Sequence, residues 1–183
     1  MYLEETFRKS KELIKYLKKF CKNHEVEFHH AQIKPEFKNN ISKCYICSRE
    51  KRKRVFELAE KEGIKKIALG HHKEDVVESL LLGLFFCREV SAMKIKQDFF
   101  KGRLFIIRPI YFFTDEDIQE YIKKAKIKIV KTVCPYAKEN KREILRRFIK
   151  ELKKVDKTVL DNILFGIRNI NEKYFPSNII RCE

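Results

Sequence analysis

Apolar residues along the first two thirds of the chain alternate between helical and strand-like spacing. Between residues 3 and 21 they recur every three or four positions with lysines between them, which predicts an opening amphipathic helix. Residues 25–31 alternate as in a short strand, and residues 34–43 contain proline and asparagine, which predicts a loop. The pattern therefore opens with helix, strand and loop.

Later segments repeat this alternation. Further strands are expected over residues 64–69, 104–107 and 127–130, and further helices over residues 48–61, 75–86, 143–152 and 159–170. Thr114 and Asp117 resemble a capping box that begins one more helix, ending near Lys124. Strands that alternate with helices favour an α/β fold whose parallel sheet is covered on both faces.

Two regions differ in character. Residues 1–135 carry the alternating elements and are expected to form the α/β domain, whereas residues 136–183 are helical and basic and are expected to form a C-terminal extension. A nucleotide-binding sheet usually opens with a strand and a glycine-rich turn. Because this pattern opens with a helix, we expect a partial, doubly wound sheet that lacks its first strand.

Composition and charge narrow the class of protein. The 183 residues are 44% hydrophobic and 12% aromatic, which is typical of a folded globular chain. Lysine and arginine number 42 against 26 acids, a formal charge of +16, which favours a nucleic-acid partner over a solvated, lysine-rich surface. No apolar run reaches membrane-spanning length and the first residues are acidic, so a cytoplasmic protein without membrane association is expected.

The cysteines supply the first candidate chemistry. Cys44 and Cys47 form a CxxC pair, whose spacing suits a shared metal centre or a redox dithiol. His29 and His30 close the first predicted strand and are candidate partners in a zinc site, although ordinary strand histidines are the simpler interpretation. Cys134 precedes a proline, an arrangement that recurs near iron–sulfur ligands.

A second candidate site lies at Gly70, His71 and the residues up to Asp75. This segment follows a predicted strand and begins a helix, where free N–H groups and the helix dipole favour an anion. The alternative is an ordinary turn with two surface histidines.

Basic residues flank both cysteine motifs. Either run could be a solvated helix face, but their coincidence with the cysteines favours a reactive centre that faces a polyanion, and we expect RNA contacts from six of them: Arg49, Arg52, Lys53, Arg142, Arg146 and Arg147.

Together these residues resemble the cluster-dependent PP-loop tRNA thiolases, the tRNA 2-thiocytidine synthetases and their thiouridine relatives. The matching stretches run in the family's order from about residue 10 to residue 179. They are Cys44 to Arg49, Ile67 to Asp75, Ile107 to Pro109, Cys134 with Pro135, and Leu164 to Ile170 followed by Tyr174 to Ser177. The resemblance implies an adenine nucleotide alpha hydrolase-like fold.

The resemblance also implies a reaction. ATP adenylates the carbonyl oxygen of a tRNA pyrimidine, and sulfur then displaces AMP. Cys44, Cys47 and Cys134 would hold a [4Fe–4S] cluster with one iron left open, Gly70 and His71 would lie on the nucleotide side, and Asp75 would match a catalytic acid. A sulfur donor and tRNA are the implied partners, with a homodimer as a further possibility.

The sequence departs from the family at the phosphate loop. The family carries Ser-Gly-Gly-x-Asp-Ser, but the five glycines here, at positions 63, 70, 83, 102 and 166, are never adjacent. We therefore expect ATP and Mg binding to be incomplete in this chain alone. A separate PP-loop polypeptide, an upstream start and a repurposed remnant are the three explanations.

Two rival functions stand beside this one. A non-catalytic, metal-stabilised RNA-binding module would explain the charge and the CxxC pair. The lysidine branch of the same superfamily needs no cluster, and the three cysteines argue against it.

Overall fold

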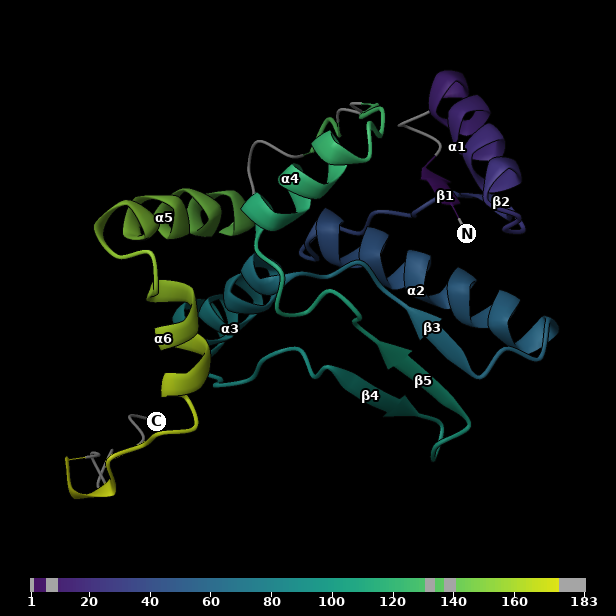
Figure 1. Ribbon diagram of the computed structural model, residues 1–183. Helices are drawn as coiled ribbons and strands as arrows, with labels where there is room; N and C mark the ends of the chain where they lie inside the picture. Colours follow the sequence, from purple (N-terminus) through teal and green to yellow (C-terminus); the bar gives the residue numbers. More distant parts are fainter. Residues whose placement is uncertain (1, 6–9, 131–133, 137–140, 175–183) are drawn as a thin grey trace.

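The computed structural model describes residues 2–5, 10–130, 134–136 and 141–174 (Figure 1). The elements in chain order are β1 (Tyr2–Glu5), α1 (Lys11–Asn23), β2 (His30–Ile33), α2 (Lys43–Lys61), β3 (Lys66–Ala68), α3 (Lys73–Cys87), β4 (Lys96–Phe99), β5 (Leu104–Ile107), α4 (Asp115–Lys124), α5 (Lys141–Val155), α6 (Val159–Gly166) and a short 3-10 helix, Glu172–Tyr174. None of the helices in these ranges is long and apolar enough to span a membrane.

The strands form two small sheets. β1 pairs with β2 in parallel, and the second sheet has the order β3-β5-β4, with β3 parallel and β4 antiparallel to β5. β5 is the central strand, and its Leu104 and Ile106 are buried. These parallel pairings, joined by helices, confirm the predicted α/β class.

The beginning of the chain differs from the prediction. Residues 2–5 form a strand, and the helix begins only at Lys11, where the Ser10 hydroxyl accepts a hydrogen bond from the Leu13 N–H at 3.2 Å. Local apolar spacing could not reveal β1, because its pairing partner β2 lies about 28 positions further along the chain. A strand therefore precedes α1, and the five residues between them, 6–10, include no glycine.

One further predicted strand is absent, and one strand was not predicted. Residues 127–130 are not a strand, whereas the polar segment Lys96–Phe99 is, because it forms a hairpin with β5. The hairpin turns through Phe100 and Lys101, whose φ angles are 53° and 57°, before Gly102. A polar edge strand of this kind has no apolar alternation to find.

The predicted helices are mostly confirmed, with shifted ends. The helix predicted from residue 48 begins at Lys43, so both cysteines of the CxxC pair lie within α2, and the helix predicted to residue 170 ends at Gly166.

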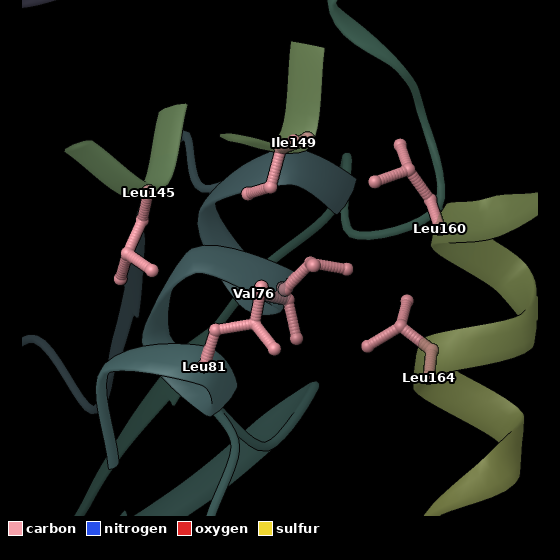
Figure 2. Close-up of a cluster of buried hydrophobic side chains, with 7 residues drawn as sticks. Val76, Leu81, Leu145, Ile149, Leu160 and Leu164 are labelled. Atoms are coloured by element: carbon pink, nitrogen blue, oxygen red, sulfur yellow. The ribbon is translucent and has the colours of Figure 1, made fainter. Parts of the chain in front are cut away.

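The main core lies where α5 and α6 pack on α3. Figure 2 shows Val76 and Leu81 of α3 facing side chains of the two later helices. Val76 and Val77 are fully buried. The cluster consists of Val76, Val77, Leu81, Leu145, Ile149, Leu160 and Leu164.

A buried charge reinforces this contact. Glu78 of α3 is 2% exposed and accepts hydrogen bonds from Arg142 at 2.6 Å and Arg146 at 2.8 Å, both on α5. The proposed division between residues 135 and 136 stays a prediction, but the helices of the extension share their core with α3.

Candidate functional site

The parallel pairing of β3 with β5 brings two strand ends together. The Leu69 N–H donates to the Ile107 carbonyl at 2.9 Å, which places Gly70 and His71 beside Arg108. The carboxyl ends of parallel strands are where α/β folds bind ligands. The Gly-His turn predicted from the sequence therefore lies at such an edge.

A hydrogen bond from Arg108 determines which nitrogen of the His71 ring carries the proton. Arg108 is 6% exposed, its Nε–H donates to His71 Nδ1 at 3.2 Å, and its Nη1 donates to the Lys94 carbonyl. Burial lowers the pKa of His71, and the nearby charges of Arg108 and Arg142 lower it further against the opposing effect of Asp75. An imidazole that accepts at Nδ1 and stays neutral carries its proton on Nε2, so His71 can donate to a ligand.

Gly70 leaves space at the end of β3. A Cβ built at this position would meet no protein atom within 4 Å. The fold itself therefore does not require glycine here, and the backbone is open to a closely approaching group.

The first turn of α3 is held by its own side chains. His72 is the N-cap residue, and its N–H donates to Asp75 Oδ2 at 3.2 Å in a capping box. Asp75, the predicted catalytic acid, is thus fixed at the helix start beside the Gly-His turn.

A histidine–carboxylate cluster adjoins this turn and was not predicted. His72 Nδ1 lies 3.1 Å from Glu74 Oε2, and His72 Nε2 lies 3.3 Å from Asp115 Oδ1. Burial raises the pKa of Asp115, as do Glu74 and Glu116, against the lowering effect of His72 and Lys153. His72, Glu74 and Asp115 offer ligand atoms within 4.8 Å of one another, and within the described ranges they form the only such group of three. This arrangement suits a divalent cation.

Ion pairs link this cluster to α4 and α5. Lys153 Nζ lies 2.8 Å from Glu74 and 2.6 Å from Glu116 at the edge of a hollow of about 980 Å³. Asp115 is the first residue of α4 and lies about 40 positions after Glu74 in the sequence. Only the fold brings the two carboxylates together, so sequence spacing could not predict this cluster.

Two of the three candidate ligand cysteines lie at the start of α2. Cys44 and Cys47 are one turn apart in the first turns of this helix, and the described cysteines are thiols. The Tyr136 ring lies 4.4 Å from Lys43 Nζ and packs against Phe37 with centroids 5.2 Å apart. These contacts hold the segment of Cys134 against the same end of α2.

This thiol set fits a [4Fe–4S] cluster. All three cysteines are half-buried, and thiolates are the ligands that hold iron–sulfur clusters in proteins. In a cluster each thiolate binds its own iron, whereas a zinc ion draws all its ligand atoms to about 2.0–2.3 Å from one point. Among the described residues no group of that compactness combines the cysteines with His29 or His30.

The predicted RNA-binding residues fall into three settings. Arg49, Arg52 and Lys53 line a groove beside α2. Arg142 and Arg146 form ion pairs with the buried Glu78. These two arginines therefore also stabilise the packing of α5 on α3, a role that the sequence did not reveal. Arg147 is exposed on α5.

The profile of the PP-loop domain matches residues 4–152, most of the chain. The chain belongs to the PP-loop domain family. Among curated PP-loop relatives, a tRNA-cytidine(32) 2-sulfurtransferase of Pelobacter propionicus is 30% identical over 152 residues, and its counterpart in Geobacter metallireducens is 29% identical over 174 residues. These alignments cover 82% and 92% of this chain but 56% and 68% of the relatives, so the chain spans little more than half to two thirds of their length.

A solved structure agrees on the fold of this PP-loop chain. It is a U34-tRNA thiolase of Methanococcus maripaludis with its [4Fe–4S] cluster, and it superposes with a TM-score of 0.70 at 16% identity. The match covers 91% of this chain and 59% of the other.

Proposed function

We propose that this chain is the cluster- and tRNA-binding part of an iron–sulfur-dependent tRNA thiolase, a transferase of the cytoplasm. The observation that carries the proposal is the place of Cys44 and Cys47 in the first turns of α2, next to Lys43, whose Nζ lies 4.4 Å from the ring of Tyr136, two residues after Cys134, in a PP-loop chain. The relatives and the structural neighbour act on tRNA by name, which supports a tRNA pyrimidine as the substrate.

The three thiolates would hold a [4Fe–4S] cluster, which when bound supplies an open iron for sulfur transfer. Gly70 would let a nucleotide approach the backbone, and His71 would donate from Nε2 to it. The N-terminus of α3 would stabilise phosphate charge. Asp75 keeps that helix start in place and presents a carboxylate beside the nucleotide.

ATP binding needs a further part. The glycines of residues 1–183 are never adjacent, so a Ser-Gly-Gly-type cradle for the phosphates has to come from outside these residues. We propose that a PP-loop segment supplied with this chain completes the ATP and Mg site and allows adenylation of the pyrimidine. A sulfur donor is required, and a second copy of the chain is a further candidate partner.

Reconstituted thiolation tests the proposal. The chain, purified anaerobically and loaded with iron and sulfide, is mixed with tRNA transcripts, ATP, Mg and sulfide. The mixture also contains the part of the Geobacter metallireducens relative that this chain does not match. We expect thiolated pyrimidine by mass spectrometry only when all components are present. Absence of product with a loaded cluster and bound tRNA would contradict the catalytic assignment.

The second candidate is a non-catalytic, metal-stabilised RNA-binding module. The charge of +16 and the lack of adjacent glycines favour it. It predicts salt-sensitive RNA binding and a tightly held metal, with no thiolation under any complementation.

A further inference from the structure

A groove of about 720 Å³ lies between the second half of α2 and the β4–β5 hairpin. It lies at the opposite end of β3 and β5 from the Gly-His turn, since Lys65 and Leu104 precede or begin these strands. The cysteines and the α3 turn do not contribute to it, so it is separate from the site described above.

Aromatic rings form one part of the groove. The Phe56 ring lies 5.2 Å from Phe99 and 5.9 Å from Phe100, measured between centroids. Phe100 is 54% exposed although it belongs to this cluster. Its backbone, like that of Lys101, is in the left-handed region that side chains rarely adopt, so the turn displays a ring to solvent at a conformational cost.

Cations dominate the rest of the lining. The positively charged residues of the lining outnumber the acidic ones. The cations are Arg49, Arg52, Lys53, Lys65 and Arg103, and the acids are Glu57 and Glu60. Arg54 and Lys53 both contact Glu57, at 2.9 and 3.9 Å, which partly neutralises it. The Arg103 guanidinium lies 6.0 Å from the Phe100 ring centre.

Exposed rings amid cations are the combination that binds single-stranded nucleic acid, because bases stack on the rings while the cations neutralise phosphates. A duplex would offer the rings no base face. An acidic protein segment would satisfy the cations but leave the ring faces without stacking partners.

We propose that this groove binds an unpaired segment of RNA, with one base stacked on Phe100 and the adjoining phosphates on Arg52, Lys53 and Arg103. Cys47 and Phe56 are nine residues apart on α2, a rise of about 14 Å, so a short strand reaches from the groove toward the cysteines. The proposal rests on the proposed function only in identifying the RNA as tRNA.

The test measures binding of a fluorescein-labelled, 12-nucleotide single-stranded RNA to the full chain by anisotropy, without ATP. Phe100→Ala should weaken binding by about fivefold to 150-fold, the range expected for one stacked base. Phe100→Leu, which keeps apolar volume but loses the ring, should weaken it similarly. The matched control is Phe165→Ala, which removes a 58% exposed ring on α6 outside the groove and should leave affinity unchanged.

Charge provides a second measurement. The double substitution Arg52→Ala and Arg103→Ala should weaken binding and reduce the slope of log affinity against log salt by about 1.4, since each phosphate contact on a single strand contributes about 0.7. Equal affinities for Phe100→Ala and Phe165→Ala, or wild-type binding by Phe100→Leu, would overturn the proposal. So would a preference for duplex RNA or for an acidic peptide used as competitor. Because neither cluster nor ATP enters this assay, its failure is distinguishable from a failed thiolation.

Discussion

The ion pairs of Glu78 give the sharpest stability prediction. The carboxylate is 2% exposed, whereas the side chains of Arg142 and Arg146 are 36% and 58% exposed. Removing the two arginines leaves a buried charge without compensation, which costs about 3–5 kcal/mol of unfolding free energy. Removing the charge of Glu78 instead lets the arginines turn to water, so the loss is closer to that of charge-assisted hydrogen bonds, about 1.5–3 kcal/mol.

The test compares the stability lost on removing the two arginines with the stability lost on removing the charge of Glu78. Urea unfolding of the metal-free, reduced protein, followed by circular dichroism, gives the free energy of unfolding for the double variant Arg142→Ala/Arg146→Ala and for Glu78→Gln. We expect the double arginine variant to be the less stable of the two. Adding Glu78→Gln to it should restore part of the loss, because the stranded charge is gone.

The matched control is Arg147→Ala with Lys150→Ala, which removes two exposed cations from the same helix. It should change stability by less than about 0.5 kcal/mol. The reasoning is refuted if Glu78→Gln costs more than the double arginine variant, or if the arginine variant costs less than about 1 kcal/mol at an unchanged urea dependence.

Three further changes test the core, the α3 helix and the Gly-His turn. Leu145→Ala, in the cluster between α5 and α3, should cost about 2–5 kcal/mol in urea unfolding. Gly83→Ala should destabilise α3 in the same assay, although alanine is the better helix former, because its Cβ would lie 2.7 Å from the Glu89 carbonyl oxygen. Burial depresses the pKa of His71, so the folded state binds this proton less readily than the unfolded state, where the pKa is about 6.5. Its contribution to stability is present above that value and lost as pH falls below it, so His71→Asn should flatten the decline between about pH 6.5 and pH 5.

Each of these three expectations can fail visibly. Gly70→Ala is the control for Gly83→Ala, since its Cβ would meet no protein atom within 4 Å, and equal stabilities of the two variants would contradict the clash. An unchanged pH slope in His71→Asn would show that this imidazole does not titrate differently on folding. A loss below about 1 kcal/mol in Leu145→Ala would contradict the close packing seen in Figure 2.

The long elements could be predicted because their signals are local. The amphipathic spacing of α2 and α5 lies within each segment, and so do the apolar runs of α3 and β5. Strands β1 and β4 could not be predicted, because each is short and is stabilised by a partner strand elsewhere. An opening helix was predicted in place of β1 for this reason.

The candidate site divides in the same way. The sequence indicated Gly70, His71 and the cysteines from motif spacing, but not the hydrogen bond from Arg108 to His71, which joins positions 37 residues apart. It also missed the cluster of His72, Glu74 and Asp115, whose members come from two helices. A single acid, Glu78, within an apolar run was the one available signal of a buried ion pair.

Metal analysis of the anaerobically purified chain tests the central claim most directly. Iron, acid-labile sulfide and zinc are measured in the wild type, in Cys134→Ser and in the control Cys87→Ser, which changes an exposed cysteine on α3. The account predicts about four irons and four sulfides per chain in the wild type and the control, and loss of both in Cys134→Ser. Zinc in place of iron, or an unchanged iron content in Cys134→Ser, would contradict it.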